Sequence, residues 1–483
     1  MDIQNKLQAV LDIGIALSAE KDSFVLFDMI VGKNMEITNC DSGTLYIYND
    51  EKLEFHITNT LSLEVDRTGL IGKVDFSPIP MTDQNVCAYA AHHRLALNIP
   101  DIYKNSEFDF SWAKNYDRAT GYNTKSMLVV PLVDVNKNTM GVLQLINAMD
   151  DDGNIIPFDD SFNDIIFSLA SQTAIAISNM KYERELQSQM WSFTEAMAAA
   201  IDELTPYNAN HTKKVAQYCG KIADHINLLH EQGKESEYFS PERKEQLIMG
   251  AWLHDVGKLV IPLDVMNKIS RLQGRERDIE NRLRIISLDV RVRFLEKSVS
   301  ADYYEDVISK TNEALDLLRL VDNAEPLSKE IKDRLENILD IVYEGEDDVI
   351  PFFTQDEKEC MTIEAGTLTP GEREIMESHV VFTKKILDKV YFDSYFKDSS
   401  KWAYEHHEFL DGTGYPRHLT AEDLELETRI MTVADICDAL MATDRPYKKS
   451  LPKEQVFDIM RKMAGDGKID SRIVEYLYDC IDI

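Results

Sequence analysis

Two pairs of neighbouring side chains in the sequence could hold metal ions. His254 and Asp255 lie together in AWLHDVGK, and His406 and His407 lie together in HHEFLDGTGYP. The apolar run 248–253 before the first pair predicts a buried helix. Since buried hydrophilic side chains need a partner, we expect this pair to bind a cation.

Three further candidate ligands stand alone: His211 in NHTKKV, His379 in MESHVV, and Asp435 in the apolar run IMTVADICDAL. A lone helical histidine is more often a surface residue. His211 and His379 are therefore candidate ligands only in combination with the two pairs. Together the seven residues offer five imidazoles and two carboxylates. This set exceeds the four ligands of a structural zinc site and fits two ions that share Asp255.

Lys258 follows His254 by four residues, a spacing that places both on one face of a helix. Its ammonium group could there hold a phosphate oxygen. Two neighbouring ions would generate a hydroxide from water and neutralise charge on a phosphoryl group. The pattern therefore predicts metal-assisted phosphoryl chemistry, with Asp255 and Lys258 as catalytic residues.

His254, Asp255 and Lys258, followed by HHEFLDGTGYP, resemble the HD-GYP subgroup of the HD superfamily of metal-dependent phosphohydrolases. The pattern HHExxDGxGYP matches at every fixed position, and the resemblance covers residues 206–483. It implies two metal ions, iron with manganese as the alternative. By this resemblance one ion would be held by His211, His254, Asp255 and Asp435, and the other by Asp255, His379, His406 and His407.

The resemblance also implies a cyclic dinucleotide substrate, cyclic di-GMP first, cut to linear pGpG, to GMP, or to both. Substrate-binding residues implied in this way are Lys258, Gly412, Gly414, Tyr415, Pro416, Arg445 and Lys448. Three alternatives stay open: a cyclic GMP-AMP phosphodiesterase, another HD nucleotide phosphohydrolase, and a non-catalytic receptor. Asn210 replaces a glycine common in relatives, and Tyr207 replaces a glutamate that recruits a third ion in some of them.

Residues 1–180 mix strand and helix patterns and resemble a GAF sensor domain. Asn147, Phe158 and Asp159 match part of the motif of cyclic-nucleotide-binding GAF domains, but Ala148 and Asp160 replace its lysine and glutamate. A small-molecule ligand and a purely dimerising role are both open for this domain.

The fold class that follows is multidomain: an α+β GAF domain, a connecting helix over 181–204, and an all-α HD-GYP domain over 205–483 with a helical insertion at about 271–365. Apolar side chains recur on the connecting helix at spacings of four and three residues, which predicts a coiled coil and a homodimer: Leu186, Met190, Phe193, Met197, Ala200 and Leu204. The alternative is that this helix packs on its own domain.

The insertion carries two apolar stripes, typical of a helical hairpin or pair of helices: Leu272, Ile279, Leu283, Ile286 and Val290, then Ile331, Leu335, Ile338 and Val342. Its sequence leaves a lid, a dimer contact and a passive insertion equally open.

Acidic residues number 85 against 52 basic ones, a net charge of −33, which argues against binding a nucleic acid polymer. No run approaches the roughly 18 apolar residues of a membrane span, so we expect a cytoplasmic protein with no membrane contact. The six cysteines lie far apart, which predicts neither a disulfide framework nor a cysteine zinc site.

Overall fold

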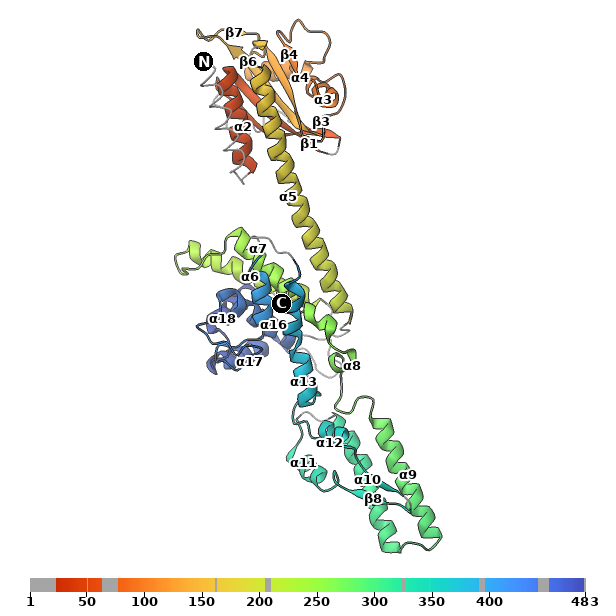
Figure 1. Ribbon diagram of the computed structural model, residues 1–483. Helices are drawn as coiled ribbons and strands as arrows, with labels where there is room; N and C mark the ends of the chain where they lie inside the picture. Colours follow the sequence, from red (N-terminus) through yellow and green to blue (C-terminus); the bar gives the residue numbers. More distant parts are fainter. Residues whose placement is uncertain are drawn as a thin grey trace. The chain divides into compact units, whose positions relative to one another are not determined.

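The computed structural model (Figure 1) describes residues 23–49, 51–62, 77–160, 163–204, 210–323, 326–346, 348–390, 396–441 and 451–481. The chain divides into two compact units, Met1–Gln189 and Met190–Ile483. Helix α5 (Asn163–Leu204) contains the division point. The boundaries expected at residues 180 and 204 stay predictions.

The first unit is built on an antiparallel sheet of order β3-β2-β1-β6-β5-β4, with β7 paired to β6. Its strands are β1 (Cys40–Asn49), β2 (Lys52–Thr60), β3 (Ile79–Pro80), β4 (Leu97–Ile99), β5 (Met127–Val133), β6 (Thr139–Met149) and β7 (Ile155–Ile156). The helices of this unit are α2 (Ser23–Thr38), α3 (Val86–His93), α4 (Ser111–Thr120) and the first part of α5.

Strand β6 has a nearly continuous apolar sequence because both of its faces are buried. Its side chains alternate between the two faces, so Leu143 and Leu145 pack in the core with α2 and α5, whereas Val142 and Ile146 pack in the core with α3 and α4. Both faces are therefore covered by helices. The prediction of an α+β sensor domain is confirmed.

The residues expected to form a coiled coil on the connecting helix differ in burial. Met190 and Met197 are half-buried and pack with a core cluster that includes Met249 of the second unit. Leu186 and Phe193 are 64% and 61% exposed. The helix is present as predicted. Met190 and Met197, however, pack on their own domain, which was the alternative to a coiled coil.

The core of the second unit lies between helices α6 (His211–Glu231), α7 (Pro241–Leu253), α16 (Leu426–Met441), α17 (Lys453–Gly465) and α18 (Ser471–Cys480). The shorter elements around it are η2 (Val256–Val260), α8 (Leu263–Met266), α13 (Pro370–Glu377), α14 (His379–Leu387) and α15 (Ser399–Glu405). Helix α13 begins at a capping box in which Thr369 and Glu372 each bond the other's backbone N–H. This fixes the approach to His379 at the start of α14.

The insertion contains α9 (Glu276–Leu295), α10 (Ala301–Asn323), α11 (Lys329–Glu336), β8 (Val342–Glu344), β9 (Val349–Pro351) and α12 (Gln355–Met361). It has a hydrophobic core of its own, which includes the predicted stripe from Leu272 to Val290. The two ends of the insertion meet, because Thr367 Oγ1 donates to the Lys268 carbonyl (3.0 Å) and Lys268 Nζ pairs with Glu372 (2.6 Å).

One prediction about the insertion is wrong. Val342 was expected to continue a helical stripe, but α11 ends at Glu336 and Val342 is a half-exposed residue of β8. Strand β8 pairs with β9 in a hairpin, and both strands contain β-branched residues: Val342 in β8, and Val349 and Ile350 in β9. Such residues favour strands over helices. The second unit is therefore mainly helical rather than all-α.

No helix in the described part of the chain is both long enough and apolar enough to cross a membrane.

Candidate metal centre

The first histidine–aspartate pair lies at a change of helix type. Helix α7 ends at Leu253, His254 is its C-cap, and Asp255 precedes the 3₁₀ helix η2. The expectation that Lys258 shares an α-helical face with His254 is therefore wrong. The tighter turn instead points Lys258 back at Asp255, with Nζ 2.5 Å from Oδ2.

Gly257 lets η2 approach the helix that carries the next ligand. A Cβ at this position would lie 1.9 Å from the His379 carbonyl oxygen and 2.5 Å from the Thr383 nitrogen, so only glycine fits. The Gly257 N–H donates to Thr383 Oγ1 (2.9 Å), which donates to the His254 carbonyl (3.0 Å). Thr383 thus joins the elements that hold His254 and His379.

Three other elements bring the remaining candidates. His406 and His407 directly follow α15, and the His406 carbonyl accepts from Thr432 Oγ1 at 2.8 Å. Asp435 lies on the same helix as Thr432, α16. His211 is the first residue of α6, after Asn210 with a φ of 67°. That left-handed conformation explains the glycine preference expected at 210, and asparagine tolerates it better than most residues.

Three of the imidazoles are oriented by the same bond. The Nδ1 atoms of His254, His379 and His406 each lie 2.7 Å from a backbone carbonyl three residues earlier. A carbonyl can only accept, so each Nδ1 carries the hydrogen and each neutral ring keeps a lone pair on Nε2. These three Nε2 atoms are buried and have no hydrogen-bond partner among the described residues.

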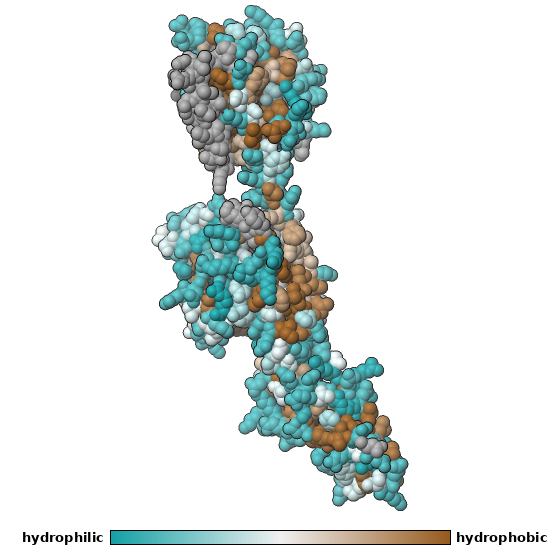
Figure 2. Space-filling view, in the orientation of Figure 1, coloured by the Kyte–Doolittle hydropathy of each residue, from teal (hydrophilic) through white to brown (hydrophobic). Residues whose placement is uncertain are grey.

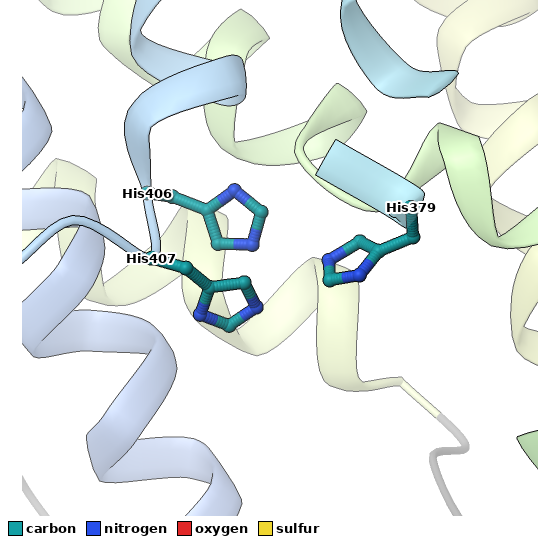
Figure 3. Close-up of side chains that lie close together, drawn as sticks. All are labelled: His379, His406 and His407. Carbon is teal, nitrogen blue, oxygen red and sulfur yellow. The ribbon is translucent and has the colours of Figure 1, made fainter. Parts of the chain in front are cut away.

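The side chains form two groups, His211 with His254 and Asp255, and His379 with His406 and His407. Within each group the candidate ligand atoms lie within 4.8 Å of one another. Figure 3 shows the second group, whose three rings gather around one space.

Asp255 lies between the two groups. Its Oδ2 is 3.2 Å from His254 Nε2 and 3.6 Å from His211 Nε2, whereas its Oδ1 is 3.4 Å from His379 Nε2. The two oxygens of one carboxylate therefore face different groups of imidazoles. This is the geometry expected of a ligand that two ions share.

Asp435 also reaches both groups. Its Oδ1 lies 3.2 Å from His211 Nε2, and its Oδ2 lies 3.8 Å from His407 Nδ1. The resemblance had placed this carboxylate at the first ion alone.

His211 is oriented by a side chain instead of a carbonyl. Asp438, one helical turn after Asp435, accepts from His211 Nδ1 at 2.6 Å and is buried. Sequence reasoning missed Asp438, although the argument made for Asp435, a carboxylate in an apolar helical run, applies to it equally.

Burial and charge shift the pKa values of the candidate ligands in different directions. Burial acts to lower the pKa of His211, but Asp255, Asp435 and Asp438 outweigh it and hold that pKa well above its usual value. Burial, with the nearby His407 and His254, holds the pKa of His406 well below its usual value, and burial lowers the pKa of His407 to about 3. Burial also acts to raise the pKa of Asp255, but Lys258 and the histidines outweigh it and hold that pKa well below its usual range. Neutral imidazoles and ionised carboxylates are the forms that bind metal ions.

The residues fit a pair of divalent cations. A lone pair on a buried Nε2 that faces a carboxylate oxygen is repelled unless a positive charge lies between them. This applies at His254 and at His379, both of which face Asp255. In the described part of the chain the other such group is Asp83 with His92 and His93, which is exposed and bonded within itself.

The loop after His407 closes over that side chain. Tyr415 N donates to the His407 carbonyl (3.2 Å), and the two rings lie 4.9 Å apart between centroids. Gly414 is required here, because a Cβ would lie 2.3 Å from the Phe409 nitrogen. The buried Glu408 carboxylate accepts from Arg417 N (2.6 Å) and Leu419 N (2.9 Å), which holds the far side of the loop.

Family models match the chain in both units. A GAF domain model matches residues 25–177, and two HD domain models match residues 208–337 and 357–473. The chain combines a GAF domain with an HD domain. The resemblance of the second unit to the HD superfamily and of the first to GAF domains is confirmed.

Curated relatives of this chain include two proteins of Vibrio cholerae and one of Thermotoga maritima. It is 42% identical over 97 residues to a 3'3'-cGAMP-specific phosphodiesterase 3, with 20% of each chain covered. It is 34% identical over 112 residues to a 3'3'-cGAMP-specific phosphodiesterase 1, covering 23% of this chain and 25% of that protein. It is 36% identical over 103 residues to a cyclic di-GMP phosphodiesterase of Thermotoga maritima, covering 21% and 27%. The chain thus spans about a quarter of the length of these relatives.

Most of the expected site residues of the HD domain come together. The seven expected ligands converge, Lys258 joins them through Asp255, and Tyr415 covers His407. Gly412 and Pro416 lie in the same loop, and Gly412 has a φ of 78°. Arg445, Lys448 and Tyr207 lie outside the described residues. Besides Asp438, sequence reasoning missed Thr383 and Glu408, which position the ligands and the loop.

Proposed function

We propose that the HD domain is a metal-dependent phosphodiesterase that hydrolyses a cyclic dinucleotide. One observation carries this: the two oxygens of Asp255 face separate groups of imidazoles, and His254 and His379 turn unpaired Nε2 atoms toward it. Two ions that share a carboxylate suit the in-line displacement of a phosphodiester. The names of the relatives support this reaction class.

Each side chain has a role in this proposal. His211, His254, Asp255 and Asp435 would hold one ion, and Asp255, His379, His406 and His407 the other. When bound, the ions supply activation of water and neutralisation of charge on the phosphoryl oxygens. Mixed imidazole and carboxylate donors suit iron, with manganese as the alternative. Lys258, through its contact with Asp255, adds positive charge where a phosphate would lie.

The proposed substrate is cyclic di-GMP, with cyclic GMP-AMP as the competitor. Relatives named for each nucleotide match this chain over similar lengths, so the comparisons favour the class of substrate rather than one member. Tyr415, Pro416 and the two glycines of the loop would form the pocket wall beside His407. Arg445 and Lys448 remain proposed contacts to phosphate or base.

Regulation by the GAF domain and a homodimer through α5 belong to the same proposal. Exposed apolar residues recur on α5 at Ile175, Tyr182, Leu186 and Phe193. Their spacings of seven, four and seven residues suit pairing with a second copy of the helix. A GAF ligand, if the domain binds one, would act on the enzyme through this helix.

The test is cleavage by anaerobically purified protein loaded with iron or with manganese. Cyclic di-GMP and cyclic GMP-AMP are incubated in separate reactions, and the products are separated by chromatography. We expect linear dinucleotide or mononucleotide from at least one substrate, and loss of cleavage in His379→Gln. The matched control is His230→Gln, because His230 is exposed and its contacts are to the Glu235 carbonyl and the Tyr238 ring, outside the candidate metal centre. Binding of both nucleotides without turnover in every metal form would contradict the proposal and favour a receptor.

A further inference from the structure

Helix α9 of the insertion has two apolar faces. Ile279, Leu283, Ile286 and Val290 are buried in the insertion core. A second set points away from that core and is exposed: Ile285 at 57%, Leu288 at 62%, Val292 at 51% and Leu295 at 71%. Apolar side chains (brown) lie on the surface of the insertion in the lower part of Figure 2. A folded helix rarely leaves such a set uncovered without a binding role.

The exposed set follows the heptad pattern of a two-stranded coiled coil. Its spacings are three, four and three residues, so Ile285 and Val292 take the first core position and Leu288 and Leu295 the second. β-branched residues at the first position with leucine at the second favour two parallel helices over other assemblies. The pattern ends toward the N-terminus, where Asp278 and Asn281 take the equivalent positions.

The flanking charges select the direction of pairing. Arg284 and Arg291 precede the first core positions, and Asp289 and Glu296 follow the second. In a parallel pair, each flanking residue on one side meets the residue five positions later in the other helix. Arg284 then faces Asp289 of the second copy, and Arg291 faces Glu296. An antiparallel pair would instead place arginine against arginine and acid against acid.

Three of the four flanking groups are exposed. Arg284, Arg291 and Glu296 are exposed, and Asp289 is half-buried with Oδ2 accepting from the Tyr343 hydroxyl at 2.5 Å. Because α9 is already folded against α10, pairing does not have to pay for helix formation. A short two-heptad contact can therefore contribute where an isolated peptide of that length would not.

We propose that α9 is a homodimer contact, in which the exposed face of α9 pairs in parallel with α9 of a second copy of this chain. This assigns the insertion an assembly role. It is independent of the proposed phosphodiesterase activity, and the contact is separate from any pairing through α5.

A cysteine at the end of the face reports the contact directly. In a parallel pair Leu295 meets Leu295, so full-length Leu295→Cys protein should form an intermolecular disulfide under mild oxidation, whereas the wild type should not. Arg291→Glu or Glu296→Arg, each added to Leu295→Cys, creates like-charge neighbours and should slow cross-linking at least tenfold. Lys310→Glu is the control, because Lys310 is a half-exposed residue of α10 that pairs with Asp306 of the same helix.

The decisive experiment mixes the two charge variants. Arg291→Glu in one copy faces Glu296→Arg in the other, so the mixture should recover cross-linking while each variant alone stays slow. No disulfide in Leu295→Cys would overturn the proposal, as would charge variants that cross-link like the parent. A mixture that cross-links no faster than either variant alone would also overturn it, because residues 291 and 296 would then not face each other. Because the disulfide forms at Leu295 itself, a dimer made through α5 alone gives no signal.

Discussion

Replacement of Asp438 tests whether the carboxylates around His211 serve metal binding. Asp438 accepts from His211 Nδ1 at 2.6 Å, and its side chain is only 3% exposed. The bond fixes the hydrogen on Nδ1 and turns Nε2 toward Asp255 and Asp435. Asp438→Asn keeps the shape and an acceptor oxygen but removes the charge, whereas Asp438→Ala removes the acceptor as well.

Two independent estimates of the free-energy cost of replacing Asp438 agree. A hydrogen bond to a charged group contributes about 1.5–3 kcal/mol. Loss of a carboxylate behind a metal-bound histidine typically weakens metal affinity by about 10–100-fold, which is about 1.4–2.8 kcal/mol at about 1.4 kcal/mol per tenfold. We therefore expect the dissociation constant at one of the two ions to rise about tenfold in Asp438→Asn and toward a hundredfold in Asp438→Ala.

The measurement is competition for manganese between metal-free protein and a chromophoric chelator, which resolves the tighter and the weaker ion. Asp224→Asn is the matched control, because Asp224 lies on the same helix as His211 but is 63% exposed and pairs with Lys244. Thermal unfolding of the metal-free variants reports any general damage. If both Asp438 variants fold and keep both metal affinities within twofold, Asp438 does not act through His211 and the reasoning is refuted.

Three further substitutions test the elements around the centre. Gly257→Ala should lower the free energy of unfolding by about 1–3 kcal/mol, because backbone must move away from the new Cβ. Gly220→Ala on α6, where a Cβ meets only ordinary contacts, should instead be neutral or stabilise by up to about 1 kcal/mol, and urea unfolding measures both. Glu372→Gln should cost about 1.5–3 kcal/mol at pH 7, since it removes the charge paired with the buried Lys268. Burial acts to raise the pKa of Glu372, but Lys268 outweighs it and holds that pKa below its usual value. The difference from wild type should therefore be complete above about pH 4.3 and fade as the pH falls through the lowered pKa, which unfolding at a series of pH values would show. Glu408→Gln should raise the KM for the cyclic dinucleotide severalfold with little change in metal affinity, because one of the two backbone N–H groups that bond the carboxylate loses its acceptor oxygen. An equal loss of metal affinity would contradict this.

Residue type and spacing singled out the two neighbouring pairs of candidate ligands. His254 with Asp255, and His406 with His407, are neighbours in sequence, and a buried cluster of such side chains has few uses other than binding cations. Their partners His211, His379 and Asp435 are remote in the chain, and the resemblance supplied that connection. The structure brings the side chains together as predicted.

Where sequence reasoning failed, tertiary context decided the outcome. A helix was expected to continue through Lys258, but packing of Gly257 on α14 tightens that segment into a 3₁₀ turn. The spacing of Val342 fits a helical stripe, but its pairing with β9 places it in a strand. Asp438, Thr383 and Glu408 act through single hydrogen bonds to remote partners, and periodicity carries no signal for such bonds.

The meeting of the two ends of the insertion bears on how this chain folds. His254 and His379 are 125 residues apart in the sequence, and an unstructured loop of that length would have to be closed at an entropic cost before they could meet. The insertion has its own core and its ends join at Lys268 and Thr367, which leaves separations of only 14 residues from His254 to Lys268 and 12 residues from Thr367 to His379. We therefore expect the insertion to fold before the candidate ligands meet, so that slow folding of this remote segment would delay metal binding.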